Sequence, residues 1–164
     1  MAAVAEKPRA VTKKHVEERL RDWERRLREL FARVEKWSIA QWGKGCVTHG
    51  SIVPPREYAM EEAGVGPRRL PTLTVQVPQA GNMPMTISLV PSCLWIIGAN
   101  GRVDVRVGVK GGELFLQRSV HHVLVDLGGK DGQSSDWQIR NRDPRKVLEP
   151  FTKDVLLRIA SGRP

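Results

Sequence analysis

The fold of this chain is decided by residues 94–109, which read LWIIGANGRVDVRVGV. Asn100-Gly101 is a strong signal for a two-residue turn, because both central residues of a type I′ turn need a positive φ, which Asn and Gly adopt at the least cost. The sequence therefore predicts a β-hairpin closed at this turn. Its strand pairs would be Ile96 with Val105 and Leu94 with Val107.

A second turn signal, Gly111-Gly112, predicts another hairpin directly after the first. It would pair Val109 with Leu114 and Val107 with Leu116. The valines between the two turns alternate with other residues in a period of two, which is typical of a half-buried strand. Both hairpins place the same apolar side chains on one face. Residues 94–127 are therefore predicted to form an antiparallel β-meander with a well-specified register.

The opposite face of this predicted meander is partly apolar, which is unusual for a face in contact with solvent. Its members are Trp95, Ile97, Asp104, Arg106, Phe115 and Gln117. The interpretation we favour is that a helix or a loop of the same domain covers this face. The alternative is a binding surface with aromatic anchors, for which Trp95 is the candidate.

Length and composition predict one domain with a sizeable core, since the chain has 164 residues of which 40% are hydrophobic. No apolar run comes near the length of a membrane span. The first 14 residues are charged and lack an apolar stretch, so we expect no secretory signal. Cys46 and Cys93 match no metal-binding spacing and are expected to be reduced thiols in a cytoplasmic protein.

The net charge of +9 is concentrated at the two ends of the chain. Residues 1–36 carry 11 basic and 7 acidic side chains, and residues 138–164 carry 7 basic and 3 acidic ones. Residues 37–137 are nearly neutral, with 9 basic and 8 acidic side chains. This distribution favours a partner that is an acidic protein surface or a nucleic acid and that the ends of the chain reach.

A long helix is predicted to begin at Lys13, with Thr12 as its N-cap, and to end near Trp42 before Gly43. Residues 1–11 are expected to form a mobile arm, and residues 12–164 a single α+β domain. Apolar residues follow a heptad spacing along the helix. They are Val16, Leu20, Trp23, Leu27, Leu30, Val34 and Trp37.

This apolar seam has two interpretations. In the favoured one, the helix lies along the sheet of its own domain, because two Trp residues at d positions are bulky for a two-stranded coiled coil. In the other, the helix pairs with a second copy of the chain and forms a homodimer. Four acid-before-base pairs at i, i+4 are expected to support the helix. They are Glu17–Arg21, Asp22–Arg26, Glu24–Arg28 and Glu29–Arg33.

The rest of the chain is predicted to complete an α+β fold: a long N-terminal helix, an antiparallel β-meander sheet of about five to seven strands, and a C-terminal helix. Residues 43–70 are expected to be loop-rich, with one helical turn around residues 56–63. Strands are expected at residues 72–77, at 85–90 (ended by Pro91), at 120–127 and, as a short last strand, at 137–139. Asp143-Pro144 is a helix-start signal. The final helix is predicted over residues 151–160, with a buried stripe of Phe151, Val155, Leu156 and Ile159 and with Gly162 at its end.

The sequence contains three possible catalytic patterns, and each of them is incomplete. His122 and Asp126 share a strand face, but His121 points the other way, so at best two metal ligands converge and we predict no cofactor. A metal-dependent nuclease would use Asp104 and Glu113, but Phe115 stands where the Glu-x-Lys pattern expects a lysine. Cys46 and His49 could act as nucleophile and base, but the sequence shows no third residue that would complete a catalytic triad with them.

The best candidate site is a basic cluster of Arg140, Arg142, Arg145 and Lys146, with Trp137 upstream and Trp95 as a further contact residue. Arginines near an aromatic ring suit phosphate contacts and base stacking, or an acidic protein surface. A charged loop in solvent is the plain alternative. The function we favour is non-catalytic binding of an acidic or anionic macromolecule, as in an inhibitor of the immunity or antitoxin type. The alternatives are a nucleic-acid-binding protein and the nuclease.

Overall fold

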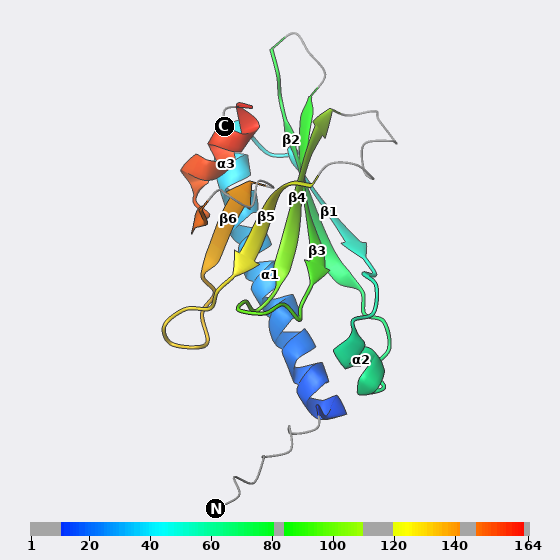
Figure 1. Cartoon of the computed structure of the whole chain (residues 1–164). Helices are drawn as coiled ribbons and strands as arrows, with labels where there is room; N and C mark the ends of the chain where they lie inside the picture. The colour runs from blue at the N-terminus through cyan, green and yellow to red at the C-terminus, as the bar shows by residue number, and fades with distance from the viewer. Residues whose placement is uncertain (1–10, 81–83, 110–119, 142–146, 163–164) are drawn as a thin grey trace, which may run out of the picture.

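Three helices and a seven-stranded antiparallel sheet make up the computed structural model, which describes residues 11–80, 84–109, 120–141 and 147–162 (Figure 1). The helices are α1 (Lys13–Trp42), α2 (Tyr58–Glu62) and α3 (Lys153–Ala160). The strands are β1 (Val47–Ile52), β2 (Leu70–Val77), β3 (Met85–Cys93), β4 (Arg102–Val109), β5 (Val120–Asp126), β6 (Trp137–Asn141) and β7 (Glu149–Pro150). The predicted α+β fold class is confirmed.

The sheet is a meander, because the strands lie in the order β1 to β7 in which they occur in the chain. Each strand is antiparallel to the next one. The predicted strands at residues 72–77 and 120–127 correspond to β2 and β5. Leu73, Val75 and Val77 of β2 are buried, as their alternation with polar residues predicts.

Helix α1 begins and ends where the sequence predicts. The Thr12 side chain accepts a hydrogen bond of 3.3 Å from the amide of His15, which makes it the N-cap. Gly43, with a φ of 86°, ends the helix. The predicted pairs Asp22–Arg26 and Glu24–Arg28 are confirmed. Glu29 pairs instead with Arg25, one turn earlier in the helix.

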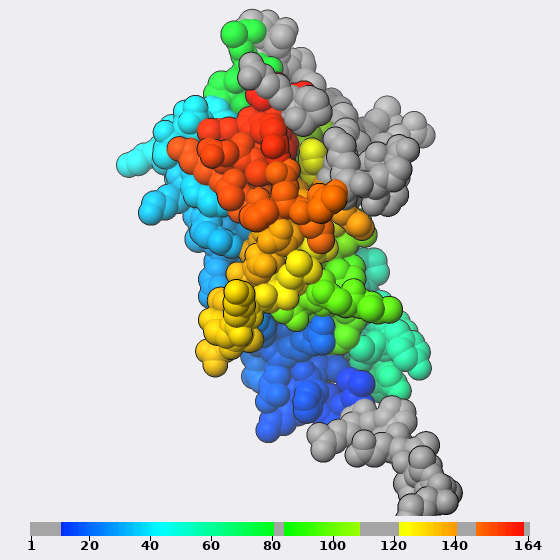
Figure 2. All heavy atoms as spheres, turned by 60° about the vertical axis from the view of Figure 1, so that its left-hand side comes forward, coloured from blue at the N-terminus to red at the C-terminus, as the bar shows by residue number. Residues whose placement is uncertain are grey.

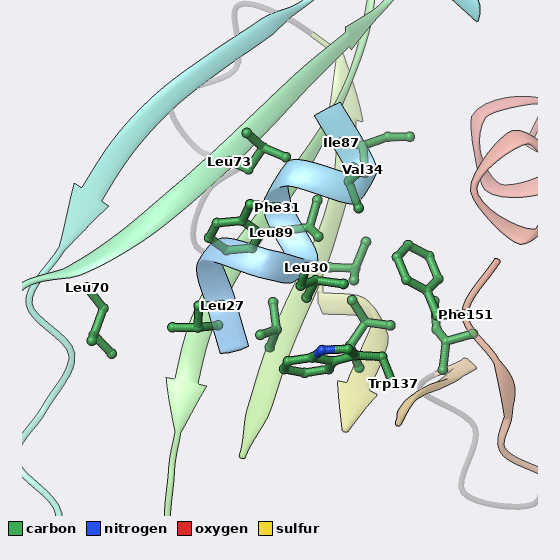
Figure 3. Close-up of a cluster of buried hydrophobic side chains, with 14 of the residues drawn as sticks. Leu27, Leu30, Phe31, Val34, Leu70, Leu73, Ile87, Leu89, Trp137 and Phe151 are labelled. Atoms are coloured by element: carbon green, nitrogen blue, oxygen red, sulfur yellow. The ribbon is translucent and has the colours of Figure 1, made fainter. Parts of the chain in front are cut away.

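The apolar seam of α1 packs against the sheet. Val16, Leu20, Trp23, Leu27, Leu30 and Val34 are all buried in the core that α1 shares with the strands. Figure 3 shows Leu27 and Leu30 among the side chains of the sheet. Trp37 is half-buried and meets the Phe151 ring edge-on, with centroids 5.8 Å apart. The favoured interpretation of the seam is thus confirmed, and the seam is not left open for a coiled coil.

A second connection fixes α1 to the segment between β5 and β6. The buried guanidinium of Arg26 donates to the carboxylate of Asp126 over 3.0 Å and to the backbone oxygen of Ser134 over 2.9 Å. Arg25 also reaches the backbone oxygen of Gln133. In Figure 2 this segment, in yellow, lies against the blue surface of α1.

The predicted hairpin at Asn100-Gly101 is wrong. Val105 lies opposite Leu89 and Val107 lies opposite Ile87, so the partner of β4 is β3 and not residues 94–97. Residues 94–101 form the connection between the two strands. Asn100 does not have the positive φ that a type I′ turn requires, since no residue other than glycine has one in the described part of the chain.

Tertiary contacts explain why the local turn signal fails. The carboxylate of Glu57 accepts hydrogen bonds from the amides of Leu94 (2.7 Å) and Trp95 (2.8 Å), which holds the chain outside the sheet at this point. Gly101 faces the ring of Trp23 so closely that an added Cβ would lie 2.1 Å from a ring carbon. The glycine at this position therefore serves the contact with α1 and not a turn.

Three further predictions about the strands need correction. Pro91 does not end β3, which continues to Cys93 with an irregularity after Pro91. Pro91 lies beyond the last residue pair between β2 and β3, so its missing N–H removes no bond to β2. Strand β1 was not predicted, because its side chains are mostly exposed and show no apolar alternation. Strand β7 follows β6, so residues 137–139 are not the last strand.

The C-terminal helix is confirmed as α3. Thr152 is its N-cap, and the four residues of the predicted stripe are buried. Gly162 has a φ of 66° directly after the last turn. The Gly111-Gly112 turn, its pairs with Leu114 and Leu116, and the Asp143-Pro144 signal lie outside the described residues. The first described pairs of β4 with β5 are Arg106 with Val120 and Val105 with His122.

Candidate binding surface

The side of the sheet that faces away from α1 is the candidate binding surface, and we call it the outer face. Val103 and Val105 of β4 are buried in the core with α1, so Arg102, Asp104 and Arg106 point to the outer face. The register of the neighbouring strands gives its other members. They are Thr72, Thr74, Gln76, Thr86, Ser88, Val90, Val123, Val125, Gln138 and Arg140.

No described helix covers the outer face. The buried side chains of α2 and α3, including Met60 and Leu156, belong to the same core as those of α1. All three helices therefore pack on the inner side of the sheet or at its ends. Among the residues that the structure describes, no helix covers this face, and a loop as its cover stays a prediction.

Positive charge gathers on the outer face. Arg102 and Arg106 lie on β4 on either side of Asp104, and Arg102 pairs with Asp104 through Nε and Oδ1 at 2.8 Å. Arg140 is in the same row as Asp104, because Val123 lies between the two on β5. Two strand spacings separate them, which is about 10 Å. Three arginines and one carboxylate thus lie on this described part of the outer face.

The exposure of Arg140 and Arg102 leaves the charges of these two side chains accessible. Arg140 is exposed, and the side chain of Arg102 keeps 38% of its accessible surface. Val123 is only 8% exposed, as expected for a small residue between longer side chains on both neighbouring strands. The charged groups of Arg140 and Arg102 can therefore be reached by a partner from solvent.

Hydroxyl and amide groups make up most of the remaining outer face. The hydroxyls of Thr74 and Ser88 lie 3.3 Å apart on neighbouring strands and share a hydrogen bond. The described part of this face contains no aromatic residue. Such a surface is suited to hydrogen bonds and ion pairs more than to apolar contacts.

Trp95 and Ile97 are not on the outer face, because they lie in the connection between β3 and β4. Trp95 is half-buried, and the guanidinium carbon of Arg19 lies 5.6 Å from the centroid of its ring, which is a cation–π contact. Ile97 is fully exposed. Trp95 therefore remains a candidate contact residue, at the end of the sheet and already in contact with an arginine.

Trp137 is in the core and leaves the set of candidate contact residues. Its side chain is 3% exposed and packs against Trp23, with ring centroids 5.8 Å apart. The alternation along β6 explains the placement, since Trp137 and Ile139 point inward while Gln138 and Arg140 point outward. Of the predicted basic cluster, the structure describes Arg140 alone; Arg142, Arg145 and Lys146 lie outside the described residues.

The groups considered for metal chemistry have other partners. One oxygen of Asp126 bonds to Arg26, and the other accepts from the amides of Gly128 (2.9 Å) and Asp136 (2.8 Å). Asp104 pairs with Arg102, and Glu113 lies outside the described residues. In the described ranges, no group of three His, Cys, Asp or Glu residues lies close enough to hold a metal ion.

The cysteines are free thiols. Burial raises the pKa of the Cys46 thiol, which disfavours the thiolate that a nucleophile would need. His49, its candidate partner, lies 3.2 Å from a carboxylate oxygen of Glu35. Cys46 and His49 therefore do not form a nucleophile–base pair in this structure.

Sequence reasoning missed Arg102 as part of the surface, although the signal was present. Arg102 belongs to the same period of two as Asp104 and Arg106, which were predicted to lie on that face. It also missed the pairing of Arg26 with Asp126, for which a single sequence gives no signal because the residues are 100 positions apart.

Comparison with known proteins gave no relative: no family model, no curated protein and no solved structure matches this chain. No helix in the described ranges has the length and apolar character needed to cross a membrane.

Proposed function

We propose that this chain is a non-catalytic binding protein whose outer face holds an acidic region of another macromolecule. The observation that supports the proposal is that Arg102 and Arg140, with Arg106 on the same face, share the described part of the outer face with one carboxylate, that of Asp104, and that no described helix covers this face. Excess charge of one sign on an open surface attracts partners of the opposite sign and raises their rate of association.

An acidic protein surface fits this face better than a nucleic acid does. Sheets that bind single-stranded nucleic acids stack the bases on aromatic side chains. The described outer face has none, and Trp137, which was a candidate for this role, is buried. Arginine forms bidentate pairs with carboxylates, and the hydroxyl of the half-buried Thr74 can add a hydrogen bond beside such pairs.

A protein that blocks another macromolecule, such as a cytoplasmic inhibitor of the immunity or antitoxin type, would use a surface of this kind. Arg142, Arg145 and Lys146 follow β6 in the chain and remain predicted contributors to the same positive charge. Nucleic-acid binding is the second candidate function, since phosphate contacts need only the basic side chains.

Binding to defined polyanions tests the proposal and separates its two forms. Labelled poly-L-glutamate, random duplex DNA and single-stranded oligonucleotides are titrated with the full chain over a salt series, with fluorescence anisotropy as the readout. We expect poly-L-glutamate to bind at low salt, and Arg106→Glu and Arg140→Glu each to weaken that binding. Arg33→Glu is the matched control, because it makes the same charge change at an exposed position of α1.

Three results would contradict the proposal as stated. Nucleic acid bound more tightly than poly-L-glutamate, with a log–log salt slope of about −0.9 for each phosphate contact, would favour the second candidate. Equal losses in Arg140→Glu and Arg33→Glu would show that overall charge, and not the outer face, is responsible. The absence of binding to any of these polyanions at low salt would contradict both candidate functions.

A further inference from the structure

A surface pocket of about 390 Å³ lies between α1 and residues 65–69, the segment that joins α2 to β2. Its lining brings together arginines from two segments that are distant in the sequence: Arg21 from α1, and Arg68 and Arg69 from the segment before β2. Glu17 is the acidic residue of the lining. The pocket is separate from the outer face, because it is built on the side of the sheet that α1 covers.

Two of the three arginines are held in place by other residues. Arg68 donates to a carboxylate oxygen of Glu24 over 3.1 Å, and Glu24 also accepts from Arg28 over 2.8 Å. The hydrogen bond from Arg28 is the main reason why the pKa of Glu24 lies below its ordinary value, so Glu24 stays ionised. One nitrogen of Arg69 donates to the hydroxyl of Ser51 over 3.0 Å. A guanidinium group has five N–H donors, so both arginines keep donors for a ligand.

Arg21 is the one of these three arginines that has no partner among the described residues. The predicted pair with Glu17 is not formed, and Arg21 makes no ion pair or hydrogen bond with any described residue, although both side chains line the pocket. Three guanidinium groups and one carboxylate leave the lining with an excess of two positive charges. The like charges of the arginines repel one another unless an anion lies between them.

We propose that this pocket binds the phosphate group of a small phosphate monoester. A phosphate monoester carries a charge of about −1.5 to −2 at pH 7 and three strong acceptor oxygens, which matches three guanidinium groups with a net excess of two charges. A carboxylate offers two oxygens and one charge, and so would satisfy fewer of the donors.

The size and the walls of the pocket indicate that the phosphate is attached to an organic group. The volume lies within the range of about 300–1,000 Å³ that is typical of small-molecule sites and exceeds what one phosphate ion fills. Val65 and Pro67 supply an apolar wall beside the arginines. The ester's organic group would rest against this wall, while Glu17 accepts a hydrogen bond from a hydroxyl or amino group of the ligand.

Isothermal titration calorimetry of the full chain tests the proposal, with adenosine monophosphate, glycerol 3-phosphate, inorganic phosphate and acetate as probes at low ionic strength. We expect the phosphate compounds to bind and acetate to bind more weakly. Arg21→Ala and Arg69→Ala should each weaken phosphate binding at least about ten-fold, as expected for the loss of a charge-assisted hydrogen bond. Arg33→Ala, the same change at an exposed position elsewhere on α1, should leave it unchanged.

The probes also separate the two sources of a phosphate group. Tighter binding of the esters than of inorganic phosphate supports a contact between the ester's organic group and the apolar wall. Equal binding would show that the pocket holds the free phosphate ion and would overturn the proposal of an ester. No heat of binding with any phosphate compound, or the same affinity in Arg21→Ala as in the unmodified chain, would overturn the site itself. Arg21 has no partner in the described chain, so its removal should not affect folding, which circular dichroism checks.

Discussion

Arg26 and Asp126 form an ion pair of 3.0 Å between Nη1 and Oδ2, and the two side chains are 4% and 0% exposed. The pair joins the first helix to the fifth strand across 100 positions of sequence. Asp126 also accepts two backbone amides, and Arg26 donates to Asp22 and to Ser134. All charges in this connection are therefore compensated, which is the condition for an ion pair to be tolerated inside a protein.

Asp126→Ala should lower the free energy of unfolding by about 3–5 kcal/mol, because it leaves the buried cation of Arg26 and two backbone amides without their acceptor. Urea unfolding followed by circular dichroism measures the change. Arg25→Ala is the control: its pairs with Asp22 and Glu29 are exposed, so it should cost less than about 1 kcal/mol. Equal losses in the two variants would contradict the special role of the buried pair.

Leu27→Ala should destabilise the protein by about 2–5 kcal/mol, because Leu27 is completely buried between α1 and the sheet. The same unfolding measurement applies. Arg33→Ala, six residues further along α1 and exposed, should change stability by less than about 0.5 kcal/mol. A stable Leu27→Ala variant would show that α1 is not docked on the sheet in solution.

Gly101→Ala should cost more than Gly98→Ala by about 1–3 kcal/mol. Both glycines have a positive φ, so both substitutions strain the backbone. Only at Gly101 would the new Cβ collide with the ring of Trp23, since no atom lies within 4 Å of a Cβ at Gly98. Thermal unfolding of the two variants gives the difference, and equal stability would contradict the close approach of α1 to this position.

Asp131 should titrate with a pKa of about 2, because its carboxylate accepts from the amide and the hydroxyl of Ser134 and from the amide of Gln133. A lowered pKa means that the carboxylate stabilises the fold above its ordinary pKa near 3.8 and loses this contribution as the pH falls through about 2. Carboxyl-detected NMR measures the titration directly. Ser134→Ala should raise the pKa, whereas Ser135→Ala, at a residue that bonds to Arg26 instead, should not.

Periodicity predicted the elements whose apolar faces are buried. The seam of α1 from Val16 to Val34, the alternation of β2 and the stripe of α3 all follow from the 3.6-residue and two-residue repeats of a half-buried element. Strand β1 has no buried face of this kind and was missed. A repeat of apolar residues predicts which face of an element is buried, so it does not detect an edge strand whose side chains are mostly exposed.

The pairing of β4 could not be predicted from its own turn signal. Asn100-Gly101 is a favourable turn sequence, but the contacts of Glu57 with the amides of Leu94 and Trp95 and of Trp23 with Gly101 come from parts of the chain far from the turn. The prediction of the candidate site also failed at one residue, Trp137. Trp137 was assigned to the surface because arginines follow it, although its alternation with Gln138 on β6 places it in the core.

The order of the strands has a consequence for how the protein folds during synthesis. Helix α1 precedes every strand in the chain, but its seam is covered by β2 to β6, and Arg26 finds Asp126 only when β5 has been made. Strands that pair with their neighbours in the chain form by local closure, one hairpin after another, whereas the docked helix needs most of them. We therefore expect the seam of α1 to stay accessible to chaperones until synthesis of the sheet is nearly complete.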